Sequence, residues 1–193
     1  MSNQRTKLYY GTRDIFRRYW RAYGGWKALV TSFYFHLAVV LTAVTFPFWS
    51  KPEWWEVPLG VLPNLTGFSL GGYAIMLSFG NAQFQKLMAK ARVDETPAFV
   101  EMSASFAHFV LVQFAALLAA FLAKSLFAVP PQCIHIARLD LLALPFWTIG
   151  AFLFIYSLTC GIAATMRIFR VSETFANIAG RDDDTQEGPH APP

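Results

Sequence analysis

Charged side chains are scarce in this chain, and four long stretches contain none. Lysine and arginine together number 16 and aspartate and glutamate 12 in 193 residues, and none of them falls within residues 28–50, 57–85, 102–123 or 141–166. A helix needs about 20 predominantly apolar residues to cross the hydrocarbon core of a bilayer. The sequence therefore predicts an all-α membrane protein with four transmembrane helices, over about residues 28–49, 58–82, 102–124 and 140–164, within a membrane domain of residues 27–166.

The usual residues of catalysis are also missing. No acidic residue lies deep in a predicted span, and the chain has no HExxH sequence, phosphate-binding glycine loop or nucleophile elbow. Two cysteines, Cys133 and Cys160, are expected near opposite faces of the membrane, too far apart to form a disulfide. These absences exclude a disulfide framework and a thiol oxidase. We expect no enzymatic activity, no metal and no cofactor.

The segment before the first apolar stretch is aromatic and basic. In a helix, its apolar and aromatic residues gather on one side, while arginines recur on another every four residues. This pattern is typical of a helix that lies in the headgroup region of a membrane. We predict a cytoplasmic interfacial helix within residues 1–26, either as a lipid anchor that sets topology or as a docking site for a cytosolic protein. Its arginines are Arg13, Arg17, Arg18 and Arg21.

The distribution of basic residues predicts the orientation. If both termini are cytoplasmic, 13 lysines and arginines lie inside and 3 outside. We therefore expect a multi-pass protein of the bacterial inner membrane. Residues 167–193 form a cytoplasmic C-terminal segment that we expect to be disordered from about residue 180, where it becomes acidic and rich in glycine and proline.

The second predicted span carries a stripe of small and amide side chains. Alternate steps of four and three residues give eight consecutive members: Gly60, Asn64, Gly67, Gly71, Ala74, Ser78, Asn81 and Gln85. Lipid tails are as apolar as leucine, so a small face is useful mainly where another helix approaches closely.

Three interpretations of this stripe stay open. The stripe packs inside the protein's own bundle, or it contacts copies of the same chain, or it lines a narrow, uncharged pore in an oligomer. The first is structural; the third predicts an ion channel or a depolarising pore.

Two histidines fall inside predicted spans at a similar depth. His36 and His108 lie on helices that run in the same direction, as the ligands of a bis-histidine haem b would. The alternative is that each histidine forms hydrogen bonds in the helix packing, for example with Ser32, Ser105 or Gln113.

Two resemblances bear on function. The first eighty residues resemble the start of bestrophin channels in their aromatic and basic leading helix and in a second span that runs from Gly67 through Ser78-Phe79-Gly80-Asn81. The chain lacks the cytosolic helical block of that family and its neck of bulky apolar residues. In size and four-span topology it resembles membrane subunits of bacterial antiviral defence systems such as Kiwa.

Together these observations predict a non-catalytic inner-membrane subunit. It forms homo-oligomers through its second span and acts as a membrane sensor or anchor for a cytosolic partner, without binding nucleic acid directly. The alternatives are an oligomeric ion channel lined by the second span and, behind it, a haem protein. The interfacial arginines and a basic loop with Lys86, Lys90 and Arg92 are the predicted docking residues for lipid or a partner.

Overall fold

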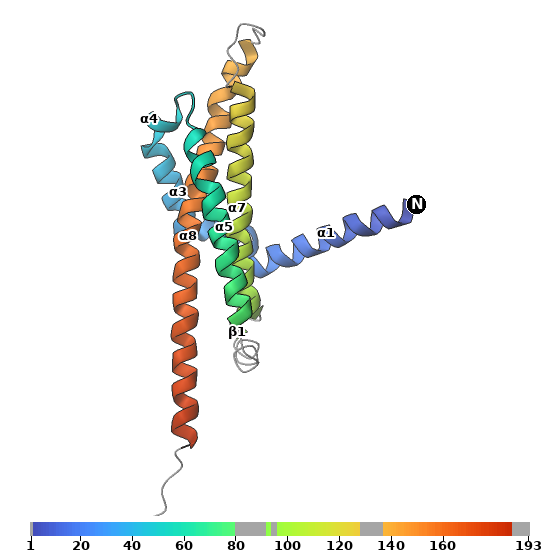
Figure 1. Ribbon diagram of the computed structural model, residues 1–193, viewed down its shortest axis with the longest axis vertical. Helices are drawn as coiled ribbons and strands as arrows, with labels where there is room; N and C mark the ends of the chain where they lie inside the picture. Colours follow the sequence, from blue (N-terminus) through green and yellow to red (C-terminus); the bar gives the residue numbers. More distant parts are fainter. Residues whose placement is uncertain (1, 80–91, 94–95, 128–136, 187–193) are drawn as a thin grey trace, which may run out of the picture.

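The computed structural model describes residues 2–79, 92–93, 96–127 and 137–186, and within these ranges the chain is helical apart from short turns and breaks and one pair of two-residue strands. The elements in chain order are α1 (Ser2–Tyr23), α2 (Gly25–Thr31), α3 (Phe33–Val44), α4 (Phe46–Trp49), α5 (Glu56–Phe79), β1 (Arg92–Val93), β2 (Thr96–Pro97), α7 (Ala98–Phe127) and α8 (Ala137–Gln186). The strands pair antiparallel, Arg92 with Pro97 and Val93 with Thr96. Figure 1 shows the long helices running along one axis, with α1 projecting sideways from them.

Two helices are each long and apolar enough to cross a membrane, Phe99–Phe127 within α7 and Ala143–Arg170 within α8. The pair α2 and α3 makes a third when it is counted as one broken span. The predicted all-helical membrane protein is confirmed at this level. α5 is less apolar, because glycine, asparagine, serine and proline interrupt its leucines.

The helices pack as a row. α3 packs on α8, α8 on α7 and α7 on α5, and α1 crosses the row where it meets α7. One apolar core cluster lies between α3, α7 and α8, around Ala38, Phe109 and Tyr156. Near the C-terminal end of α7, the Lys124 ammonium pairs with the Glu56 carboxylate at the start of α5 at 2.8 Å.

The first predicted span is broken, which corrects the expectation of one helix over residues 28–49. α2 and α3 meet at an angle of 55°. Ser32 between them has an extended backbone, with φ −68° and ψ 127°, which interrupts the helical hydrogen bonds. The turn from α1 into α2 uses Gly24 and Gly25, both at positive φ (101° and 64°), a conformation that glycine adopts without steric cost.

α8 is longer than the sequence suggests. It continues to Gln186, whereas disorder was expected from about residue 180. No proline interrupts it after Pro145, and the next pair of helix-breaking residues is Gly188–Pro189. An α-helix rises about 1.5 Å per residue, so the 50 residues of α8 extend over roughly 75 Å.

Three tryptophans around the connection between α4 and α5 are buried in the protein. Trp49, Trp54 and Trp55 are 4%, 3% and 1% exposed and form a second core cluster with alanines of α7 and α8. The Trp49 indole N–H donates a hydrogen bond to the Thr42 carbonyl oxygen at 2.7 Å. These rings therefore fix the α4–α5 connection against the row rather than facing lipid.

Gly150 is required for this cluster, and Gly150→Ala is expected to destabilise the protein. An added Cβ would lie 2.6 Å from Cη2 and 2.9 Å from Cζ2 of the Trp54 ring, which is buried and has little room to move. Overpacking of this kind costs about 1–3 kcal/mol of unfolding free energy. Thermal unfolding in detergent measures the loss, with Gly72→Ala as the control because a Cβ there meets nothing within 4 Å. Equal melting temperatures for the two variants would contradict this packing.

Candidate functional site

His108 of α7 joins three helices through both of its ring nitrogens. The Tyr19 hydroxyl of α1 lies 2.7 Å from Nδ1, and the Tyr156 hydroxyl of α8 lies 3.0 Å from Nε2. The Tyr23 ring stacks on the imidazole with ring centroids 3.9 Å apart. His108 is only 6% exposed. α1 is thus connected to α8 through one buried histidine.

The hydrogen-bond roles in this cluster follow from the imidazole. A neutral imidazole has one N–H donor and one acceptor nitrogen, so one tyrosine donates to the ring and the other accepts from it. Burial raises the pKa of Tyr19 and of Tyr23 above the usual tyrosine value, which keeps both phenols protonated. We refer to Tyr19, Tyr23, His108 and Tyr156 as the tyrosine–histidine cluster.

An ion pair between α8 and α7 lies near the cluster and is bonded to Ser105, one turn of α7 before His108. The Arg167 guanidinium of α8 donates from Nη1 to the Glu101 carboxylate at 3.0 Å and to the Ser105 hydroxyl oxygen at 2.6 Å. The Ser105 hydroxyl in turn donates to the Glu101 carbonyl oxygen at 2.8 Å. The pair is partly exposed, so solvent screens it and its main effect is to fix the register of α7 against α8.

A polar cavity of about 370 Å³ opens between these groups and the α2–α3 break. Its lining combines hydroxyl, imidazole and guanidinium groups, and the residues that matter below are Tyr23, Ser32, Ser105, His108, Arg167 and Arg170. The volume falls within the range of small-ligand pockets, which begins at about 300 Å³.

The predicted small stripe of the second span faces away from the rest of the protein. Its first five members, Gly60, Asn64, Gly67, Gly71 and Ala74, are all exposed. A Cβ added to any of the three glycines would meet nothing within 4 Å. Ser78, Asn81 and Gln85 lie outside the residues whose side chains the structure describes.

The face of α5 that packs on α7 is a different one. Leu62, Thr66 and Ser69 are 0%, 6% and 7% exposed. Since a helix turns about 100° per residue, these positions lie about 150° around α5 from the stripe. The Gln113 side-chain amide of α7, fully buried, donates to the Ser69 hydroxyl oxygen at 3.3 Å. Among the described residues, packing within the protein therefore uses one face of α5 and leaves the small face exposed.

Four of the predicted docking residues lie together on α1. Arg13, Arg17, Arg18 and Arg21 are all exposed, and Arg18 pairs with Asp14 at 2.6 Å. Lys86 and Lys90 lie outside the described residues. Arg92 belongs to β1, but its side chain is likewise outside the description.

The two intramembrane histidines have separate roles. His36 is exposed on α3, and its Nδ1 donates to the Ser32 carbonyl oxygen at 2.9 Å. Both nitrogens of His108 are engaged by tyrosines, so a bis-histidine haem would have to displace these bonds, and we do not propose one. In the part of the chain that the structure describes, no three His, Cys, Asp or Glu side chains come together as metal ligands.

Sequence reasoning placed His108 in a packing role but did not identify its partners. The signal was present in α1, where Tyr19 and Tyr23 are four residues apart and share a helix face. Comparison with protein families, curated proteins and solved structures finds no match to this chain.

Proposed function

We propose that this protein is a non-catalytic membrane subunit that self-associates through α5 and connects the bilayer to a cytosolic partner. The observation that carries the proposal is the outward orientation of the small face of α5. In lipid, helices associate through small residues that permit close backbone contact. Contact with lipid tails does not stabilise a glycine-rich face with an exposed asparagine. A Cβ added to its three glycines would meet no described atom of the protein within 4 Å.

The proposed membrane position follows from the geometry of α1. α1 meets α7 at His108, and residues 108–127 of α7 rise over about 30 Å, the thickness of the hydrocarbon core. α1 would then lie in the headgroup layer on one side. With α2–α3 and α5 counted as spans the chain crosses four times, and the excess of basic residues in the termini and middle loop supports cytoplasmic termini.

The tyrosine–histidine cluster supplies the connection between bilayer and partner. A change in how α1 lies on the lipid surface would move Tyr19 and Tyr23, and both contact His108. His108 is bonded in turn to Tyr156 on α8. α8 continues from Arg170 to Gln186, which is roughly 25 Å beyond the membrane-spanning part. We propose that this extension and the α1 arginines contact the partner.

Reversing charge at two α1 arginines tests the partner interaction. Arg13→Glu with Arg17→Glu is expected to abolish capture of the cytosolic partner from cells that express it, because both guanidinium groups are exposed on one face. The oligomer should keep its mass in native detergent, since α5 is untouched. The control is Lys51→Glu with Arg13 and Arg17 intact, which changes charge in the loop before α5. Unchanged capture by the α1 variant would refute this docking site.

An ion channel is the second candidate, favoured by the exposed Asn64 on the small face of α5. In a symmetric oligomer this face would surround the axis and bring amide groups together, which can replace part of the hydration shell of an ion. Purified protein in liposomes should then release a trapped ion, and Asn64→Leu should reduce the flux. Absence of flux at varied voltage, pH and lipid composition would leave the anchoring role as the function.

A further inference from the structure

In the membrane position proposed above, on which this inference rests, the polar cavity lies at the level of the lipid headgroups. It adjoins α1 through Tyr23 and the charged pair through Arg167 and Ser105. Arg167 and Arg170 of α8 bring two guanidinium groups to its lining, and Ser32 and Ser105 bring hydroxyls. Guanidinium groups and hydroxyls are the side chains that bind phosphate oxygens best, since both donate hydrogen bonds and the guanidinium carries the opposite charge.

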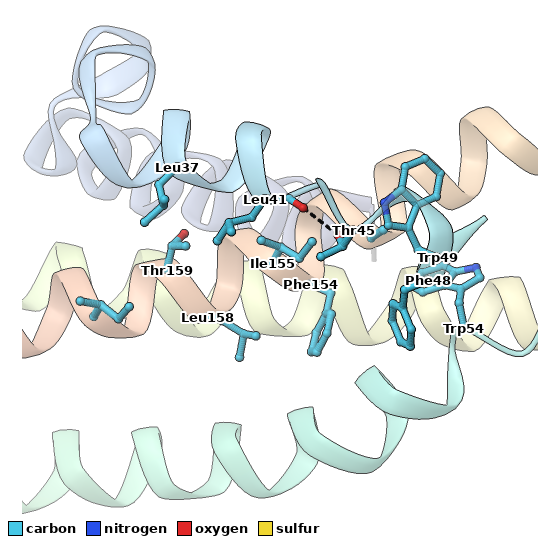
Figure 2. Close-up of a pocket in the computed structure, with 12 residues that line it drawn as sticks. Leu37, Leu41, Thr45, Phe48, Trp49, Trp54, Phe154, Ile155, Leu158 and Thr159 are labelled. Carbon is cyan, nitrogen blue, oxygen red and sulfur yellow. Dashed lines mark hydrogen bonds between the residues drawn. The ribbon is translucent and has the colours of Figure 1, made fainter. Parts of the chain in front are cut away.

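A second cavity lies between α3 and α8, deeper in the proposed membrane position. It measures about 350 Å³ and is lined almost entirely by apolar side chains of α3 and α8, including Leu37, Leu41, Ile155 and Leu158. Figure 2 shows Leu37, Leu41 and Ile155 between the two helices, Leu158 on the side of α8 away from α3, and Phe48, Trp49 and Trp54 at one end of the groove. Its shape and lining suit a hydrocarbon chain rather than a polar ligand.

One exposed strip of α8 borders both cavities. Leu158, Ile162 and Met166 are spaced four residues apart, so they lie on one face of the helix, and all three are exposed. Leu158 and Ile162 line the apolar groove, and Met166 lines the polar cavity. From Leu158 to Met166 the helix rises about 12 Å, less than the depth of one leaflet.

We propose that the two cavities form one binding site for a phospholipid. Its phosphate group would contact Arg167 and Arg170 in the polar cavity, and an acyl chain would lie in the groove between α3 and α8. The apolar continuation favours a phosphate carried on a lipid over free phosphate. A bound headgroup would touch Tyr23, which stacks on His108, so lipid binding would act on the connection between α1 and α8. The site does not depend on self-association through α5.

The test is native mass spectrometry of the full chain in detergent, with lipids added that share the same dioleoyl chains. Dioleoyl phosphatidic acid should remain bound at concentrations where dioleoylglycerol, which lacks the phosphate, does not. Arg167→Gln with Arg170→Gln should weaken phosphatidic acid binding by roughly tenfold or more, as expected for lost charge-assisted hydrogen bonds. Arg13→Gln with Arg17→Gln removes the same charge outside the cavity and should leave binding unchanged.

A cavity-filling variant makes the test independent of charge and of the Arg167–Glu101 pair. Ala163 lines the polar cavity and is partly exposed, so Ala163→Phe should exclude the headgroup while the protein keeps its melting temperature. Equal retention of phosphatidic acid and dioleoylglycerol by the wild-type chain would overturn the site. Binding that survives both Ala163→Phe and the arginine variant would also overturn it. Displacement of the lipid by equimolar inorganic phosphate would show that free phosphate is the ligand, contrary to the proposal.

Discussion

Gly67→Leu with Gly71→Leu is expected to convert the assembled protein into single chains. Both glycines lie on the outward face of α5, and a Cβ at either position meets no atom within 4 Å, so leucine leaves the protein's own packing intact. Between copies, two leucines would hold the helix backbones apart and remove the close contact on which association in lipid depends. We expect the mass in native detergent to fall to that of one chain and its lipid, with little change in helix content.

The matched control for this prediction is Gly72→Leu. Gly72 is also exposed with open space around it, but it lies about 100° around α5 from Gly71 and off the stripe. This variant makes one Gly→Leu change of the same kind in the same region of the helix and should keep the oligomer. If Gly67→Leu with Gly71→Leu retains its full mass, thermal stability and partner capture, the small face contacts lipid only and the proposed function is wrong.

His108→Leu is expected to loosen α1 and to destabilise the protein by about 2–4 kcal/mol. The substitution removes both hydrogen bonds of the imidazole, so the hydroxyl of Tyr156, which is 3% exposed, keeps only its hydrogen bonds with Tyr23 and Cys160. A buried hydrogen bond that is lost costs about 1–3 kcal/mol, and the lost stacking of Tyr23 adds to it. Denaturant unfolding gives the stability change, and hydrogen exchange of the α1 amides reports the detachment of the surface helix.

A second substitution separates the loss of the Tyr156 hydrogen bond from a packing defect. In His108→Leu with Tyr156→Phe the hydroxyl that lost its bond to the imidazole is absent, so this variant should regain part of the stability lost in His108→Leu. The α1 amides should still exchange faster than in the wild-type chain, because Tyr19 has lost its partner on α7. Unaltered α1 exchange in His108→Leu would show that the histidine does not hold the surface helix.

Much of the architecture could be predicted because membranes impose simple constraints on sequence. Long uncharged stretches have few structures open to them in lipid, and α7 and α8 contain the third and fourth of them. The end of α1 at Tyr23 follows from the two glycines after it. The stripe on α5 stays a predicted contact face, because an unbroken run of small residues is useful mainly against another backbone.

The sequence could not predict features that depend on side chains far apart in the chain. No proline or glycine marks the break at Ser32. It lies where the chain passes from α2, which contacts α1, to α3, which packs on α8. The buried position of Trp54 depends on Gly150 nearly a hundred residues later. Tyr19 and His108 are likewise 89 residues apart, and no pattern within either helix links them. Which face of α5 packs internally was open for the same reason.

The row arrangement of the helices has a mechanical consequence. Within the described residues, α5 makes its only extensive helix contact with α7. The most extensive contact of α3 is with α8. A displacement that begins at the small face of α5, where we propose that copies meet, would therefore pass through α7 before it reaches α8. His108, with its bonds to the amphipathic helix on one side and to Tyr156 on the other, stands on that route. Contact between neighbouring chains and the state of the lipid surface would thus act on the same imidazole.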